Sequence, residues 1–216
     1  MTCSFPLLRV PRPFRHMLPA AVAALVATAA LTTPLHAAAK PGEAAPAFTL
    51  VDATGQRHAL KDHAGTWVVL EWVNFDCPFV RKQYRSGNMP ALQRKWRDKG
   101  VVWYAVNSSA PGKQGHFEGD ALTARIAEEK SAASAYLLDP HGRTGRAYGA
   151  KTTPHMFVID PQGKVVYAGA IDDKPTTRLE DVPGARNYVD EALTLAMAGK
   201  AVKTPATGAY GCTVKY

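Results

Sequence analysis

Short apolar runs rich in Val, Ile and aromatic residues recur along the chain and predict β-strands. Runs of this kind cover residues 68–73, 101–107, 135–138, 153–160 and 165–169. Residues 47–60 alternate between apolar and polar positions around Thr54-Gly55, which predicts a β-hairpin. The strands therefore begin with a hairpin on the N-terminal side and continue as more deeply buried segments.

Apolar residues at helical spacing fill the intervals between these runs. One helix is expected from Pro78, with a break near 86–90 and a second part over 91–99. Further helices are expected at 121–130 with Asp120 as N-cap, between 139 and 149, and at 188–197 with Asn187 as N-cap. Alternating strands and helices predict an α/β fold, with a central mixed sheet flanked by helices and an N-terminal β-hairpin.

Cys77 lies where the first buried run ends and a helix begins. Pro78 suits the first helical turn, because its missing N–H would be unpaired there in any case. The start of a helix presents free N–H groups and positive potential, which stabilise a thiolate. A small buried side chain is the ordinary role of a cysteine, but this position favours a reactive thiol.

The first 39 residues are typical of a secretory signal peptide. Three arginines and no acid precede an Ala/Val/Leu run at 17–31, and small residues follow at 37–39. We expect this segment to be removed, so the protein would be periplasmic or secreted, with no membrane segment after cleavage. Residues 40–46 are expected to be a linker, 47–199 the folded domain, and 200–216 a C-terminal tail.

The remaining charge and cysteine content narrow the classes of function. The formal charge of +8 becomes +5 without the three signal arginines. The sequence has no basic run with interleaved aromatic residues, so nucleic-acid binding is not expected. Two cysteines remain, Cys77 and Cys212, which allow one disulfide, one metal site or two free thiols. No organic cofactor is expected.

Four features resemble the thioredoxin superfamily, and within it the redoxin or peroxiredoxin-like (AhpC/TSA-type) branch. They are the strand ending in Asp76-Cys77-Pro78, the Thr153-Pro154 pair before a later strand, Glu71 six residues before the cysteine, and the run from Asp139 to Gly163. The resemblance implies a thioredoxin-like fold. It also implies that Thr153-Pro154 forms a cis-proline loop against Cys77 and that Glu71 assists proton transfer.

Two departures from the family patterns influence the expected reaction. Val80 stands where thioredoxins carry the second cysteine of Cys-x-x-Cys, and Asn74-Phe75-Asp76 lacks the Pro and Thr that precede a peroxidatic cysteine. The resemblance therefore favours disulfide exchange over peroxide reduction. Thr153 and Pro154, with Pro78 and Phe79 beside the cysteine, are expected to line the substrate groove.

Charged neighbours have opposite effects on the expected thiol. Asp76 would raise the pKa of the Cys77 thiol, whereas Arg81 and Lys82, one helical turn further on, would lower it. Glu71 also has a simpler interpretation, in which a half-buried acid pairs with a Lys or an Arg.

Cys212 is the only candidate for a second redox thiol, because the glycines before it allow the tail to fold back. A reversible bond to Cys77 would make a two-cysteine enzyme, and a permanent one would only staple the tail. The two cysteines lie 135 positions apart (212 minus 77), so a staple would contribute on the order of 4–5 kcal/mol.

The leading hypothesis is an exported thiol–disulfide oxidoreductase or peroxiredoxin-like peroxidase with catalytic residues Cys77, Cys212 and Glu71. Its partners would be protein thiols and disulfides or small hydroperoxides, together with an unknown electron donor. A copper or zinc chaperone that binds metal through Cys77 and His155 is one alternative. A non-catalytic binding module with a structural Cys77–Cys212 disulfide is another.

Overall fold

The computed structural model describes residues 1, 2, 4 and 38–216. The chain divides into two units, Met1–Pro34 and Leu35–Tyr216, and everything below concerns the second. The expected signal peptide lies almost wholly outside the described residues. Within the part that is described, no helix is long and apolar enough to cross a membrane.

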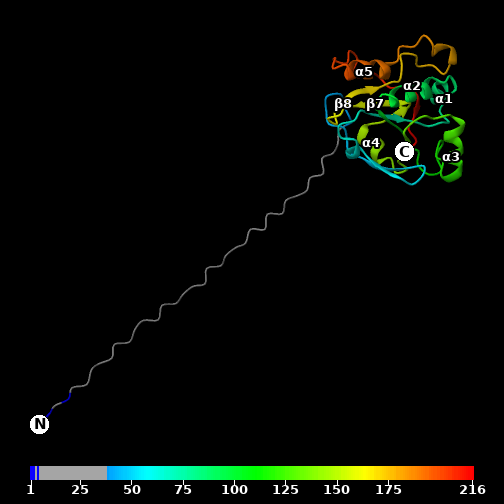
Figure 1. Ribbon diagram of the computed structural model, residues 1–216. Helices are drawn as coiled ribbons and strands as arrows, with labels where there is room; N and C mark the ends of the chain where they lie inside the picture. The colour runs from blue at the N-terminus through cyan, green and yellow to red at the C-terminus, as the bar shows by residue number, and fades with distance from the viewer. Residues whose placement is uncertain (3, 5–37) are drawn as a thin grey trace. The chain divides into compact units, whose positions relative to one another are not determined.

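The second unit contains nine strands, five α-helices and two 3₁₀ turns in its described residues (Figure 1). In chain order they are β1 (Thr49–Asp52), β2 (Arg57–Ala59), η1 (Leu60–His63), β3 (Val68–Trp72), α1 (Pro78–Arg85), α2 (Asn88–Arg97), β4 (Val102–Asn107), α3 (Gly119–Glu128), β5 (Ala135–Leu138), α4 (Arg143–Tyr148), β6 (Thr152–Thr153), β7 (His155–Ile159), β8 (Val165–Gly169), η2 (Leu179–Asp181), α5 (Tyr188–Met197) and β9 (Cys212–Thr213).

Seven strands form one mixed sheet in the order β2-β1-β5-β4-β3-β7-β8. The neighbours β3, β4 and β5 run parallel, and the β1–β2 hairpin and the β7–β8 hairpin are antiparallel. The predicted α/β class, the mixed sheet and the N-terminal hairpin are thus confirmed. The two remaining strands, β6 and β9, form a small separate sheet.

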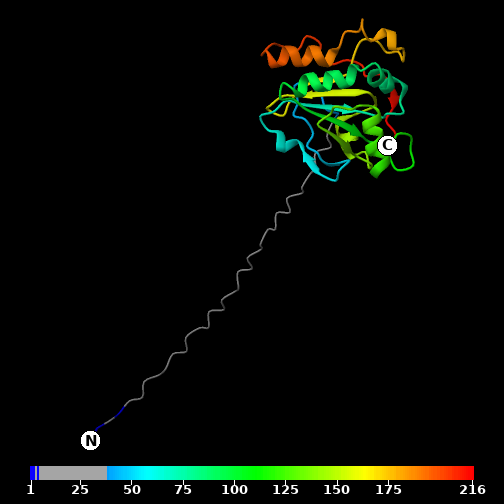
Figure 2. The same ribbon diagram turned by 45° about the vertical axis from the view of Figure 1, so that its right-hand side comes forward.

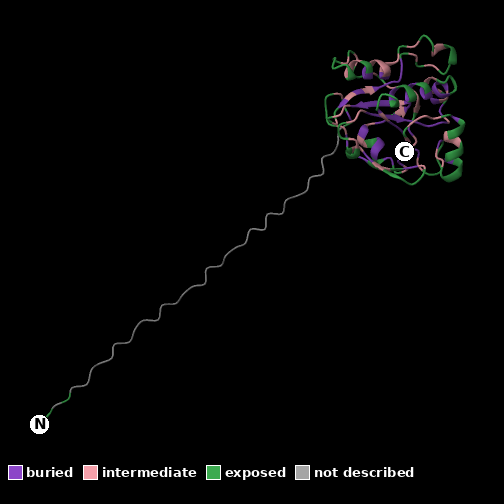
Figure 3. Cartoon of the chain, in the orientation of Figure 1, coloured by how far each residue is buried: buried purple, intermediate pink, exposed green. Residues whose placement is uncertain are grey.

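Alternation along β3 divides the apolar core between the two faces of the large sheet. Val69 and Val73 face a cluster that includes residues of α1, α2, α3 and α5, whereas Val68, Leu70 and Trp72 face a second cluster with Tyr148 of α4. Figures 1 and 2 show α1, α2 and α5 together on one side of the sheet, and Figure 1 shows α4 on the other. Buried positions concentrate in the central strands and in the helix faces that cover them (Figure 3).

Three local expectations differ from the structure. The single strand expected at 153–160 is two strands in different sheets, because Pro154 has no N–H to donate and the Thr153–Pro154 bond is cis. Asp120 is not the N-cap of α3, since Glu118 holds that position without a side-chain cap bond. The second part of the long helix begins at Asn88, with a proline tolerated in its first turn.

The segment expected to be a linker is bound to the edge of the large sheet. Gly42 donates its N–H to the carbonyl of Val165 at 2.8 Å, and Val165 donates to the carbonyl of Glu43 at 2.9 Å. Asn187 caps α5 as expected, because its Oδ1 accepts the N–H of Asp190 at 2.9 Å.

The tail is more ordered than the sequence indicates. It runs beside β8, where Ala206 bridges to Ala168, and then forms β9 against β6. Near the C-terminus, Val214 is buried in the second core cluster, and the hydroxyl of Tyr216 donates to the carbonyl of Ala150 at 2.7 Å. The tail is therefore packed on the domain rather than extending away from it.

Candidate functional site

Cys77 is the N-cap of α1, and Pro78 is the first helical residue, as the sequence predicts. The Cys77 residue is fully buried, with 0% of its surface exposed. Its Sγ donates to the carbonyl oxygen of Thr153 at 3.1 Å. The sulfur thus lies at the end of a central strand, at the start of a helix and against the loop that contains the cis-proline.

Cys212 lies directly beside this thiol. It is the antiparallel partner of Thr153 in the β6–β9 pair, so both cysteines approach the same residue. Both are free thiols. Burial, followed by the neighbouring Cys77, raises the pKa of Cys212 to about 12. The pairing of Cys212 with Thr153, whose carbonyl oxygen accepts the Cys77 thiol, thus brings the two cysteines together.

Gly211 allows the tail to approach so closely. A Cβ at this position would lie 2.0 Å from the carbonyl oxygen of Thr153, and its φ of +135° is one that L side chains rarely adopt. The oxygen that blocks a side chain at Gly211 is the same one that accepts the Cys77 thiol. Only glycine permits the tail to place Cys212 here without a shift of the backbone.

Tyr210 holds the tail from the other side. Its hydroxyl donates to Oδ1 of Asp172, and its ring meets Phe79 edge-on with 5.8 Å between centroids. The Nζ of Lys82, on the helix that begins at Cys77, lies 5.5 Å from the centre of the Tyr210 ring. The residue two positions before Cys212 is thus attached to the helix of Cys77.

Lys82 and Asp172 form a buried pair beneath this tyrosine. Both side chains have 1% or less of their surface exposed, and Nζ lies 3.8 Å from Oδ2. Lys82 also donates to the carbonyl of Lys174 at 2.6 Å, and Gln83 donates to Asp172 at 2.6 Å. Burial lowers the pKa of Lys82, and the neighbouring Asp172 partly opposes that shift. These additional hydrogen bonds stabilise the two buried charges.

Asp76, the acid next to Cys77, is paired with two arginines. Its Oδ1 lies 3.3 Å from Arg81 and 3.3 Å from Arg125, which comes from α3. Both arginines also donate to the carbonyl of Phe75, at 3.2 and 3.0 Å. The negative charge beside the thiol is therefore balanced by neighbours, one of them 49 positions away in the chain.

Glu71 is fully buried on β3 and accepts three hydrogen bonds from neutral groups. The donors are the Tyr84 hydroxyl at 2.8 Å, the Gln93 amide at 2.9 Å and the Trp103 indole at 2.9 Å. Burial raises the pKa of Glu71 to about 7, and the three donors oppose part of that rise. Among the described residues, no Lys or Arg forms an ion pair with it, so the simpler interpretation, a half-buried acid paired with a Lys or an Arg, does not apply.

The four residues expected to line a substrate groove differ in exposure. Pro78 is exposed and Phe79 is half-buried under Tyr210, whereas Thr153 and Pro154 are buried. The tail strand β9 already pairs with Thr153. In the described part of the chain, the Thr153 hydroxyl is also buried without a hydrogen-bond partner.

His155 is not brought to Cys77. Its ring packs on Phe157 with 4.5 Å between centroids, and Phe157 belongs to the second core cluster, whereas Cys77 belongs to the first. Burial lowers the pKa of His155 to about 4. Across residues 38–216, no group of three or more His, Cys, Asp or Glu side chains lies close enough to hold a metal ion.

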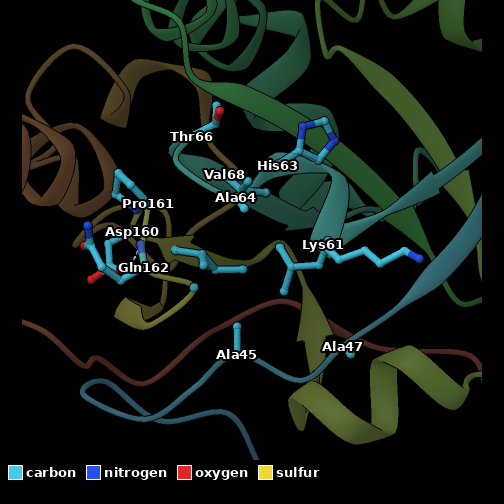
Figure 4. A pocket seen from close by; sticks show the side chains of 13 residues that line it. Ala45, Ala47, Lys61, His63, Ala64, Thr66, Val68, Asp160, Pro161 and Gln162 are labelled. Atoms are coloured by element: carbon cyan, nitrogen blue, oxygen red, sulfur yellow. Dashed lines mark hydrogen bonds between the residues drawn. The ribbon is translucent and has the colours of Figure 1, made fainter.

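A pocket of about 260 Å³ lies at the opposite end of the strands from the cysteines (Figure 4). It is lined by residues at the start of β3 and the end of β7, Val68 and Ile159, and by His63 of η1. The Nε2 of His63 lies 2.5 Å from the Tyr104 hydroxyl, and burial lowers the pKa of this histidine. Neither cysteine lines this pocket, so it is separate from the thiol site.

Sequence reasoning missed several residues that organise the site. They are Tyr210, Asp172, Arg125, Gln93 and Trp103. Lys82 falls on the apolar face of α1, where a buried lysine requires an acidic partner. That mismatch was the one signal of the Asp172 cluster in the sequence.

Comparisons with known proteins extend over most of this unit. The model of the AhpC/TSA family matches residues 41–168, which include Cys77, Thr153 and Pro154 but not Cys212. The thiol-disulfide oxidoreductase ResA of Bacillus thuringiensis subsp. konkukian is 27% identical over 125 residues. That match covers 58% of this chain and 66% of the relative, slightly less than two thirds of its length.

Solved structures support the fold alone. An uncharacterized conserved protein from Geobacillus kaustophilus superposes with a TM-score of 0.69 at 24% identity, covering 82% of this chain and 92% of that one. A putative thioredoxin from Neisseria meningitidis has a TM-score of 0.51 at 17% identity and covers 71% and 92%. The thioredoxin-like fold expected from the sequence is thus confirmed.

Proposed function

Because the chain belongs to the AhpC/TSA family, we propose that it is a thiol–disulfide oxidoreductase that uses Cys77 and Cys212 as its redox pair. The observation that carries this proposal is the position of Cys212 opposite Thr153, whose carbonyl accepts the thiol of Cys77. The similarity to a protein named thiol-disulfide oxidoreductase ResA points to the same chemistry.

The chemistry is an exchange of two electrons with a protein partner. A partner disulfide takes two electrons from the Cys77 and Cys212 thiols, which join as a disulfide, and a partner dithiol reverses the change. Cys77 is the N-cap of α1, and the N–H groups and dipole of a helix start favour negative charge, which supports its role as a reactive thiol. The Arg81 and Arg125 contacts with Asp76 reduce the repulsion that this carboxylate would otherwise exert.

Glu71 is proposed as the proton reservoir of the site. Its pKa of about 7 allows it to gain or lose a proton at neutral pH without a large change in free energy. It lies on the strand that leads to Cys77, and its carboxyl is bound by Tyr84 of α1. Glu71 thus contacts the helix whose N-terminus carries the reactive sulfur.

The test is a redox titration of the full chain carrying Cys3→Ser, with glutathione and its disulfide as the redox buffer. Thiol alkylation and peptide mass mapping would quantify the Cys77–Cys212 bond. The Thr213→Ser variant, which changes the residue after Cys212 and keeps both cysteines, is the control for changes in the tail. A bond that forms and is reduced within the range of the buffer supports the proposal. A bond that resists excess dithiothreitol would mean a structural staple, and no bond at all would also refute the enzyme.

A parallel titration with hydrogen peroxide separates the two possible oxidants. Disulfide exchange predicts faster oxidation by glutathione disulfide than by an equal amount of peroxide. The reverse ratio would favour a peroxidase instead.

Export is also proposed, from the signal-like pattern of residues 1–39. Fractionation of cells that express the full chain, followed by N-terminal sequencing, would test it. A mature protein that begins near residue 40 outside the cytoplasm is the expected result, and an uncleaved cytoplasmic chain would contradict it.

A further inference from the structure

Either cysteine of the redox pair could form the mixed disulfide with the partner. We infer that the partner's sulfur bonds to Cys212, and that Cys77 acts as the leaving thiolate when the Cys77–Cys212 disulfide is opened. This inference rests on the proposed function and deepens it. It also reverses the order suggested by the sequence, in which Cys77 makes the first contact and Cys212 resolves it.

Burial is the first argument. Cys77 has 0% of its surface exposed, whereas Cys212 is partly exposed in a strand whose next residue, Thr213, is exposed. The rate of thiol–disulfide exchange at each sulfur depends on access. A partner thiolate can reach Cys77 only if the tail first leaves β6.

The direction of attack is the second argument. A thiolate attacks a disulfide along the line of the S–S bond, from the side opposite the leaving sulfur. Cys212 is the partly exposed member of the pair, so an attacking thiolate can approach its sulfur from outside the domain. Cys77 belongs to the buried core cluster that includes Val73, Phe75 and Val80, whose close packing leaves little room for an attacking thiolate.

The chemistry of the leaving group is the third argument. The sulfur that leaves more readily is the one whose thiolate is better stabilised. Cys77 is the N-cap of the eight-residue helix α1, where the free N–H groups favour a thiolate. Burial and the adjacent Cys77 raise the pKa of Cys212 to about 12, which makes Cys212 the poorer leaving group.

The contacts of the tail preserve this arrangement. Tyr210 is bound to Asp172 and packs on Phe79, and Gly211 lies against the carbonyl of Thr153. On the other side of Cys212, Val214 donates its N–H to the carbonyl of Lys151 at 3.1 Å. The tail is thus attached on both sides of the cysteine, and Cys77 stays covered.

The step balances with a partner dithiol as reductant. The first partner thiolate bonds to the sulfur of Cys212, the Cys77–Cys212 bond breaks, and the electron pair goes to Cys77 as its thiolate. The second partner thiolate then attacks the first partner sulfur and releases Cys212, which takes up a proton. The Cys77 thiolate takes up a second proton, and the two protons are those that the partner thiols gave up. The partner loses two electrons and becomes a disulfide, and the pair on this chain becomes two thiols.

The experiment maps the first mixed disulfide. Oxidised full chain carrying Cys3→Ser is mixed with excess glutathione and stopped with acid after short intervals. The free thiol is then alkylated, and the peptides of Cys77 and Cys212 are analysed by mass spectrometry. At the earliest times we expect at least about tenfold more glutathione on Cys212 than on Cys77.

A matched pair of glycine variants tests the role of the tail. In Gly211→Ala the added Cβ displaces the tail from Thr153, so the share of glutathione on Cys77 should rise several-fold. Gly208→Ala places its Cβ in open space and should keep the wild-type ratio. A Gly211→Ala ratio equal to that of Gly208→Ala would contradict the covering role of the tail.

Two failures can be told apart. If the starting protein never forms the Cys77–Cys212 bond, the proposed function itself is refuted. If the bond forms but glutathione is found mainly on Cys77, or equally on both cysteines, the pair is redox-active and the order inferred here is overturned.

Discussion

Replacing Glu71 with Gln should change how the stability of the protein depends on pH. Burial raises the pKa of this carboxyl from 4.5 to about 7, and the Tyr84, Gln93 and Trp103 donors offset only part of the effect. Between these two pH values the folded protein holds a proton that the unfolded chain releases. The free energy of unfolding therefore falls as pH rises through this interval.

The size of the effect follows from the same two values. Each pH unit between 4.5 and about 7 changes the stability by about 1.4 kcal/mol, so the whole interval corresponds to about 3 kcal/mol. Glu71 is fully buried, so solvent does not screen the effect. Below pH 4.5 and above pH 7 the contribution is constant, because both states carry the same charge at this position.

The assay is urea unfolding from pH 4 to pH 8, followed by tryptophan fluorescence, for wild type and Glu71→Gln. Subtracting the two free energies of unfolding cancels the contributions of all other titrating groups. We expect the stability of the wild type, relative to the variant, to decrease by about 3 kcal/mol across this range. The exposed Glu43→Gln is the matched control, and a Glu71 difference as flat as that of Glu43 would refute the reasoning.

Three further predictions concern stability. His155→Gln should make the stability of the protein less sensitive to acid. Burial lowers the pKa of His155 from 6.5 to about 4, so the wild type loses stability as pH falls through that interval. If the free energies of urea unfolding of the two proteins change with pH in parallel, the prediction is wrong. Asn187→Ala should cost about 1 kcal/mol through loss of the α5 cap, whereas Glu118→Ala, which removes no cap bond, should change the chemical-unfolding midpoint little. Asp172→Ala should cost about 3 kcal/mol or more in thermal unfolding, because it leaves Lys82 buried without its acid. Adding Lys82→Met to that variant should recover part of the loss, and a further loss would count against the buried pair.

The sequence by itself determined the elements and the position of the thiol. The strand over 68–72, the helix start at Pro78 and the cap at Asn187 depend on residues within one or two turns of each other, so local spacing is sufficient to predict them. The Thr153-Pro154 pair likewise marked the point where a loop meets Cys77, through its resemblance to a known family. The fold class followed from the alternation of these elements, and the structure and comparisons confirm it.

Only the tertiary structure decided which distant groups meet. The tail could have left Cys212 in solvent, but the pairing of β9 with β6 places it on Cys77. The register of β7 against β3 turned His155 to the opposite face of the sheet, and α3 supplied Arg125 to Asp76. These contacts join residues dozens of positions apart, and they depend on strand order and on which face each side chain occupies. Local sequence spacing determines neither the strand order nor the face that a side chain occupies, because both are set only when the whole sheet is assembled.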